Sequence, residues 1–243
     1  GILLKMGSYG LIRAASMLPD AVVALQPLLA GLAFFSLIYG GLLAWRQTDL
    51  KAMIAYSSVS HMGIVLLGIA TLNIAGLTGA LMQMLAHGLV AGSLFLLIGL
   101  LYERTHTRDV NDYSSLVQVT PRFAFFTSLA LLAGMAIPGT AGFIAELHAI
   151  IGGFEAWGWT ILLISVGMMV TAAYSVRTIG RLFTGPVHNR MRNIQDLRPL
   201  ELTAAGVLAC GIILLGIAPW PALKLMASSV SQLGALFTGA QGG

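Results

Sequence analysis

Long apolar runs separated by short turns dominate the chain, and they constrain its fold more than any other feature. Seven of these runs approach the roughly 20 residues that a helix needs to cross the ~30 Å hydrocarbon core of a bilayer. They cover residues 1–18, 24–45, 50–72, 77–101, 122–151, 157–183 and 200–221. The sequence therefore predicts an all-α, polytopic transmembrane helical bundle of about seven spans, in which residues 1–243 form a single transmembrane domain.

The composition excludes the soluble classes of protein. Only 9% of the residues are charged and the mean hydropathy is +0.87, whereas a soluble domain carries roughly 25% charged residues. The polar stretches 102–121 and 184–199 are too short to form a domain that holds a nucleotide, a flavin or a cluster. A lone Cys210 excludes a disulfide framework and a cysteine-based metal site. We therefore expect any chemistry to lie within the lipid bilayer, with no nucleic acid as a partner.

The basic residues are distributed unequally between the alternate loops of a seven-span chain. One side collects ten of them: Arg46, Lys51, Arg104, Arg108, Arg122, Arg177, Arg181, Arg190, Arg192 and Arg198. The other side has two, Arg13 and Lys224. Because cytoplasmic loops carry the excess of Lys and Arg, we expect the loops at 46–50, 102–121 and 184–199 to face the cytoplasm or the mitochondrial matrix. The C-terminus then faces the periplasm or the intermembrane space.

Glu146 is the clearest candidate for a functional group at membrane depth. It follows Pro138 and Gly139, which weaken a helix, so we expect the span 122–151 to be broken near 138–140. Broken helices in transporters leave free backbone groups that line a wet cavity, and a carboxylate two turns beyond the break can face that cavity. The alternative is a structural glutamate that hydrogen-bonds a neighbouring helix.

Lys5, His61 and His87 are the other candidates within apolar runs. A buried amine can take up and release protons, and an imidazole can pass protons between its two nitrogens. Polar side chains that can hold water between these groups lie nearby: Tyr56, Ser57, Ser60, Thr78 and Gln83. Together with Glu146, the set favours a proton relay. The alternatives are a lysine that snorkels to the cytoplasmic surface and histidines that only hydrogen-bond neighbouring helices.

Other polar residues carry weaker predictions. His148 follows Glu146 by two residues, so on a helix it points to a different face. Arg177 and Arg181 lie near the cytoplasmic end of their span, where we expect them to snorkel. Asp49 precedes the third span and is expected to cap its N-terminus.

Three segments of the chain are similar in sequence, order and spacing to segments of one known protein family. They read LKMGSYGLIR at 4–13, DLKAMIAYSSVSHMG at 49–63 and LYERTHTRD at 101–109. The chain resembles, over nearly its whole length, the antiporter-like, proton-translocating subunits of respiratory complex I, the NADH:quinone oxidoreductase. The resemblance implies fourteen transmembrane helices in two inverted repeats, each with one broken helix. The spans of this chain are similar to the eighth to fourteenth, the second inverted repeat.

The resemblance also implies roles for four residues. Lys5 is similar to the connecting lysine of the family, His61 and His87 to its relay residues, and Glu146 to the terminal ionisable residue of the broken helix. Protons are then expected to pass from Lys5 through His61 and His87 to Glu146. In this interpretation the chain has no cofactor of its own, and quinone, NADH, flavin and iron–sulfur clusters are expected in partner subunits.

The chain starts at Gly1, without an initiator methionine, inside an apolar run. In this family the first repeat carries an acidic residue and, on its broken helix, a lysine. Because the resemblance covers only the second repeat, neither residue corresponds to a position in this chain. We therefore expect a piece of a longer protein, or a naturally split subunit whose first half comes from a second chain. Its other partners are expected to be membrane-arm subunits of a large hetero-oligomeric complex.

The function implied by the resemblance is proton translocation coupled to NADH:quinone electron transfer, with this chain as a non-redox pumping subunit. The membrane is expected to be the bacterial inner membrane or the mitochondrial inner membrane. Related alternatives are a subunit of a multisubunit cation/proton antiporter, of an energy-converting membrane hydrogenase or formate-hydrogen lyase, or of a ferredoxin-linked photosynthetic relative. A helical scaffold without conduction belongs to a different class, and the desolvation cost of the buried Lys, His and Glu groups argues against it.

Overall fold

The structure, a computed structural model, describes residues 1–188 and 191–241, with the side chains of residues 1–188 and 191–237. Within these ranges it is helical and has no strand, and one isolated bridge pairs Asp49 with Asp109. The α-helices are α1 (Leu3–Met17), α2 (Pro19–Ala24), α3 (Gln26–Arg46), α4 (Leu50–Ala70), α5 (Ile74–Thr105), α6 (Leu116–Val119), α7 (Pro121–Gly134), α8 (Ala141–Trp157), α9 (Ile164–Phe183), α10 (Pro199–Ile217) and α11 (Trp220–Gln241). Two 3-10 helices are η1 (Val110–Asp112) and η2 (Gly158–Leu163). The predicted all-α bundle is confirmed.

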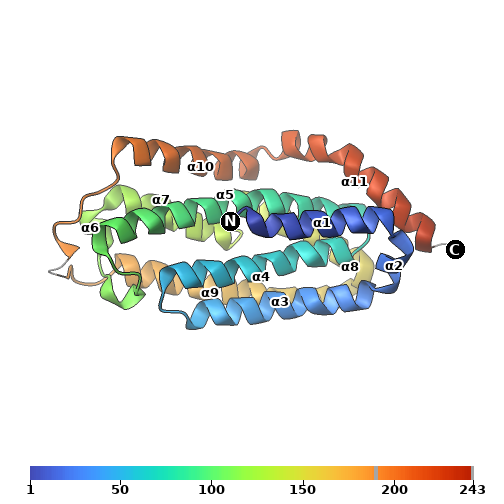
Figure 1. Ribbon diagram of the computed structural model, residues 1–243, viewed down its shortest axis with the longest axis horizontal. Helices are drawn as coiled ribbons and strands as arrows, with labels where there is room; N and C mark the ends of the chain where they lie inside the picture. Colours follow the sequence, from blue (N-terminus) through green and yellow to red (C-terminus); the bar gives the residue numbers. More distant parts are fainter. Residues whose placement is uncertain (189–190, 242–243) are drawn as a thin grey trace.

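The long helix α5 is the centre of this bundle. Its 32 residues run along the long axis of the molecule and contact α4, α7, α8, α10 and α11 (Figure 1). On one side α4 packs against α3, and α3 in turn packs against α9. Segments that lie far apart in the sequence, such as α4 and α8, therefore meet around α5.

Five segments of the described chain are long and apolar enough to cross a membrane: Gln26–Arg46, Leu50–Ala70, Ile74–Thr105, Ala141–Phe183 and Pro199–Ile217. The predicted first run forms only the 15-residue α1, followed by the short α2. The predicted run 157–183 covers η2 and α9, and Gly158, with a φ angle of 60°, ends α8 and separates it from them. The count of seven spans therefore stays a prediction.

Residues 135–140 interrupt the helical structure between α7 and α8. Ala136 and Gly139 have φ angles of 54° and 92°, and such left-handed residues cannot continue a right-handed helix. The Thr140 hydroxyl donates a hydrogen bond to the Ile137 carbonyl at 2.7 Å and holds the turn. The helix break that the sequence predicts near 138–140 falls in this segment. Because α8 starts directly after it, Glu146 lies in the second turn of α8.

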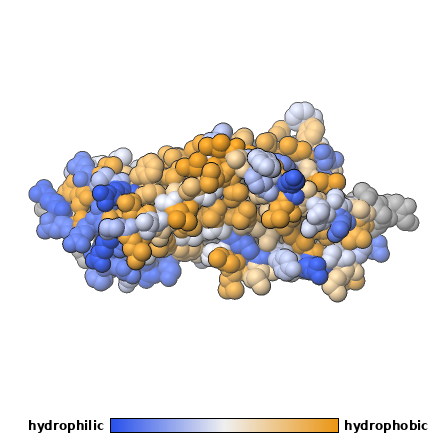
Figure 2. Space-filling model, turned by 90° about the horizontal axis from the view of Figure 1, so that it is seen from above, coloured by the Kyte–Doolittle hydropathy of each residue, from blue (hydrophilic) through white to orange (hydrophobic). Residues whose placement is uncertain are grey.

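Polar loops gather at one end of the bundle, which we call the basic end, where they join successive long helices. Figure 2 shows hydrophilic surface at this end and apolar surface along the body of the molecule. Nine described residues define it: Arg46, Lys51, Arg104, Arg108, Arg122, Arg177, Arg181, Arg192 and Arg198. Arg190 lies outside the described residues. Asp49 accepts hydrogen bonds from the backbone nitrogens of Lys51 and Ala52, which confirms the predicted cap.

Close contact between α3 and α4 depends on glycine. A Cβ atom at Gly40 would lie 2.7 Å from the backbone nitrogen of Ser60, closer than real Cβ atoms approach. The Ser60 hydroxyl uses this proximity to donate a hydrogen bond to the Leu37 carbonyl at 2.7 Å. The contact fixes the position of the α4 segment that carries His61.

Gly40→Ala is expected to lower the free energy of unfolding by about 1–3 kcal/mol, because the added methyl group forces α3 and α4 apart. Gly31→Ala is the matched control on the same helix, since no described atom outside the local backbone lies within 4 Å of a Cβ atom there. Thermal unfolding in detergent compares the two variants. A Gly40→Ala protein as stable as Gly31→Ala would contradict the close contact.

Candidate functional site

Four helices bring the predicted relay residues together in the interior of the bundle. Lys5 is on α1, His61 on α4, His87 on α5 and Glu146 on α8. Their exposed fractions are 9%, 5%, 4% and 5% in that order. Because α5 packs against both α4 and α8, the four side chains form one buried group, which we call the relay cluster.

Neighbouring members of the relay cluster lie within short distances of one another. Lys5 Nζ is 2.5 Å from His87 Nδ1. The ring centroids of His87 and His61 are 5.3 Å apart, with the planes inclined at 53°. His61 Nδ1 is 4.0 Å from Glu146 Oε1. An amine, two imidazoles and a carboxylate thus form a continuous series from α1 to α8, and each of these groups can gain or lose a proton.

The order of the two histidines differs from the expected order. The path that the resemblance implies runs from Lys5 to His61 and then to His87. In the structure His87 contacts Lys5, and His61 faces Glu146. The prediction was wrong on this point because the direction of a side chain on its helix, and not the position of the helix in the sequence, decides which group it meets.

Lys5 lies near the middle of the bundle and not at its surface. The N-terminal end of α1 is close to the centre of the long axis (Figure 1). The ammonium group also donates a hydrogen bond to the Gly1 carbonyl. A snorkelling amine extends to water, so that alternative does not describe the conformation of Lys5.

A cavity of about 10 Å³ adjoins the relay cluster on the α8 side, with Gln83, His61 and Glu146 in its wall. Gln83 Nε2 lies 3.4 Å from His61 Nδ1. Among the described residues, Gln83 Oε1 is buried without a hydrogen-bond partner. Because a polar space of about 10–15 Å³ holds one water molecule, Gln83 can link His61 to Glu146 through water.

His148 does not contact the relay cluster. Its Nδ1 lies 2.8 Å from the Ile144 carbonyl oxygen. The side chain lines a separate cleft of about 1240 Å³, together with Asn73 and Glu155, at the end of the bundle opposite the basic end. The two arginines of α9 lie at the basic end, where Arg177 donates to the Trp45 carbonyl and Arg181 to Asn111.

The sequence prediction omits a buried polar stripe on α9. Its members follow the i, i+3, i+4, i+7 spacing of one helix face: Thr171, Tyr174, Ser175 and Thr178. That spacing is a signal that the sequence does contain, because four hydroxyl groups on one face of an apolar helix mark a polar seam. Tyr174 and Ser175 lie beside the two histidines, in the wall of a second small cavity.

Comparison with known proteins finds relatives that match most of the chain. The family model described as NADH:quinone oxidoreductase/Mrp antiporter, TM matches residues 1–171. The NAD(P)H-quinone oxidoreductase chain 4 1 of Synechococcus elongatus is 44% identical over 230 residues, which cover 90% of this chain and 43% of the relative. The NADH-ubiquinone oxidoreductase chain 4 of Arabidopsis thaliana is 38% identical over 235 residues, which cover 96% and 48%. The chain therefore spans about half the length of these curated relatives.

Solved structures contain chains of similar fold. A chain of respiratory complex I from Thermus thermophilus with bound NADH has a TM-score of 0.91 and 30% identity, covering 98% of this chain and 50% of that chain. A chain of the Mrp complex from Dietzia sp. DQ12-45-1b has a TM-score of 0.85 and 21% identity, covering 98% and 52%. At the lower identity the likeness concerns the fold alone.

Lys5→Met is expected to change the ¹⁵N chemical shift of His87 Nδ1, because the variant removes the group that lies 2.5 Å from this nitrogen. His148 is the internal control, since its Nδ1 contacts a carbonyl of its own helix. NMR of the ¹⁵N-histidine-labelled protein measures both. An unchanged His87 signal would show that the lysine and the imidazole are not in contact.

Proposed function

The chain belongs to the NADH:quinone oxidoreductase/Mrp antiporter membrane family, and we propose on this premise that it conducts protons across an energy-transducing membrane. The observation that carries the proposal is the continuous series of ionisable groups from Lys5 through His87 and His61 to Glu146. Such groups are costly inside an apolar bundle and mark ion pathways. Their close spacing supports conduction from one to the next.

In the proposed path the Lys5 ammonium group gives a proton to His87 Nδ1. The imidazole releases a proton from its other nitrogen towards His61, since the two ring nitrogens accept and donate in turn. His61 then protonates Glu146, directly or through water in the cavity beside Gln83. Glu146 releases the proton towards the side of the membrane opposite the basic end.

Charge in the relay cluster couples its members to one another. Two unit charges 4 Å apart interact by about 4 kcal/mol at an effective dielectric constant of about 20. A change of charge at one group therefore changes the proton affinity of the next. In the proposed mechanism, quinone reduction in other subunits starts this sequence, and this chain carries out no redox step itself.

The relatives are subunits of NAD(P)H- and NADH-quinone oxidoreductases, and we propose that this chain works in the same kind of complex. Both are chain 4 proteins, so we infer the same subunit type, called M in bacteria. Quinone, NADH, flavin and iron–sulfur clusters belong to partner subunits in this proposal. A further partner, or a further part of the same protein, supplies the first half of the antiporter-like fold.

The basic end indicates the orientation of the chain in its membrane. Nine described Lys and Arg residues at that end correspond to the side that retains positive charge. We propose that it faces the cytoplasm in a bacterial inner membrane, or the matrix in a mitochondrial inner membrane. The C-terminus then faces the periplasm or the intermembrane space.

A second candidate function is conduction in a cation/proton antiporter complex, and the fold shared with the Mrp chain favours it. Energy-converting hydrogenases, formate-hydrogen lyases and ferredoxin-linked complexes are related possibilities. Copurification separates them: flavin and NADH-oxidising subunits support the proposed complex. A nickel site, or small membrane subunits alone, would support an alternative.

Glu146→Gln is expected to abolish proton translocation by the assembled complex and to leave its assembly intact, because glutamine keeps the size of the side chain but exchanges no proton. Glu155→Gln is the control on the same helix, at an exposed position. NADH-driven acidification of proteoliposomes measures both variants. Full pumping by Glu146→Gln would refute the assignment of this residue.

Lys5→Ala is expected to slow proton flux by about 10²-fold, the lower end of what a positioned proton donor contributes. Flux is measured in liposomes under an imposed membrane potential. Arg13→Ala, at an exposed position on the same helix, is the control. Equal flux in all three proteins would favour a structural scaffold over a conductor.

A further inference from the structure

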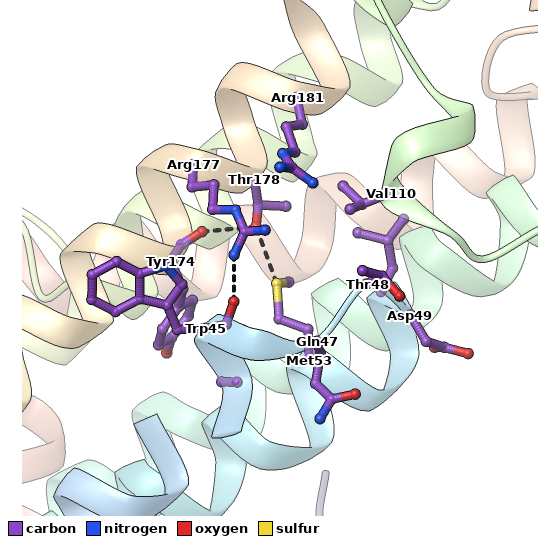
Figure 3. Close-up of a pocket in the computed structure, with 12 residues that line it drawn as sticks. Trp45, Gln47, Thr48, Asp49, Met53, Val110, Tyr174, Arg177, Thr178 and Arg181 are labelled. Atoms are coloured by element: carbon purple, nitrogen blue, oxygen red, sulfur yellow. Dashed lines mark hydrogen bonds between the residues drawn. The ribbon is translucent and has the colours of Figure 1, made fainter. Parts of the chain in front are cut away.

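A small cavity lies between the basic end and the interior of the bundle. Its volume is about 10 Å³, and its wall contains Asp49, Met53, Tyr174, Arg177 and Thr178 (Figure 3). Asp49 and Arg177 belong to the polar surface of the basic end. Met53 and Tyr174 form the inner side of the wall, because both also line a deeper cavity.

This deeper cavity has a volume of about 20 Å³ and contains Ser57, His61 and His87 in its wall, besides Met53 and Tyr174. The two histidines also line the cavity of about 10 Å³ on the α8 side. Three cavities therefore follow one another from the basic end to α8. The first and second share two lining residues, and the second and third share four. A space of about 10–15 Å³ with polar partners is large enough for one water molecule.

The Tyr174 side chain is the polar group between the small cavity at the basic end and the deeper cavity. Its ring is buried, at 3% exposure, and it lines the deeper cavity together with Ser57. Ser57 is held in place because its hydroxyl donates to the Ile54 carbonyl at 2.8 Å. A hydroxyl group both accepts and donates a hydrogen bond, so a phenol in this position can connect water on its two sides.

We propose that Tyr174 is a relay residue that passes protons from the basic end to the histidine pair, and that Ser57 is its positioning residue. The proposal rests on the proposed function of the relay cluster and adds the step that brings protons to it from the basic end.

The transfer at Tyr174 conserves atoms and charge. A proton from water in the cavity at the basic end binds the phenol oxygen. The proton that the phenol carried before leaves towards the deeper cavity. There it is taken up by the free nitrogen of an imidazole, which completes the transfer without any change of oxidation state. The hydroxyl group must rotate before the next transfer, because its new proton points to the cavity at the basic end.

Met53 closes the direct route between the two spaces. The Thr178 hydroxyl contacts Met53 Sδ at 3.0 Å and donates a hydrogen bond to the Tyr174 carbonyl at 2.7 Å (Figure 3). A methionine side chain has three rotatable bonds and no rigid branch. With Met53 in this position, Tyr174 is the polar residue that lines both cavities.

The test compares Tyr174→Phe and Ser57→Ala in the assembled complex in proteoliposomes, with Ser58→Ala as the matched control. Ser58 is the neighbour of Ser57 on α4 and donates to the same Ile54 carbonyl at 3.0 Å, but it does not line the deeper cavity. We expect Tyr174→Phe to lower proton flux by about 10²-fold. We expect Ser57→Ala to lower it as well, and Ser58→Ala to leave it unchanged.

Two results would overturn the inference. Full flux in Tyr174→Phe, in a complex where Glu146→Gln abolishes flux, removes Tyr174 from the path and leaves the proposed function standing. An equal loss of proton flux in Ser57→Ala and Ser58→Ala would show that both variants act by removing a hydrogen bond to the Ile54 carbonyl, and not by displacing Tyr174. Full proton flux in Glu146→Gln would reject the proposed function itself. This variant therefore distinguishes a failure of the proposed function from a failure of the Tyr174 proposal alone. Size-exclusion chromatography of each complex verifies that it is assembled.

Discussion

A charge inside an apolar bundle is several kcal/mol less stable than the same charge in water, and the arrangement of this protein follows from that constraint. The ionisable groups at depth do not lie singly on separate helices. Lys5, His61, His87 and Glu146 lie next to one another, so each has a polar neighbour in place of water. The proximity that lowers the cost of burial is also what the proposed proton path requires.

The helices meet these requirements through a few local features. Gly40 lets α3 and α4 approach closely and so holds the His61 segment against the bundle. The left-handed residues at 136 and 139 end α7 early, which allows α8 to start within the molecule and to bring Glu146 to the two histidines. At the basic end, polar residues such as Asp49 and Arg177 line the small cavity, whereas the body of the bundle presents apolar surface (Figure 2).

Much of the site was predictable from the sequence because polar residues in apolar runs are rare and conspicuous. Glu146, the two histidines, the helix break and the Asp49 cap all follow from local patterns of this kind. The polar stripe of α9 was predictable in principle, since its spacing is helical, but hydroxyl groups are common in membrane helices and carry little weight singly. The order of the histidines was not predictable, because it depends on the rotation of α4 and α5 about their axes.

The sequence by itself determined that the chain is an apolar helical bundle, which end carries the basic loops, and which rare ionisable groups lie inside the apolar runs. Hydropathy and charge are properties of single residues and short segments, so they can be read without coordinates. Only the tertiary structure decided that Lys5 lies at mid-length, that it contacts His87 before His61, and that Tyr174 separates two small cavities. These facts arise from the packing of helices that are distant in the chain, where side-chain volumes and glycine contacts select one arrangement among many.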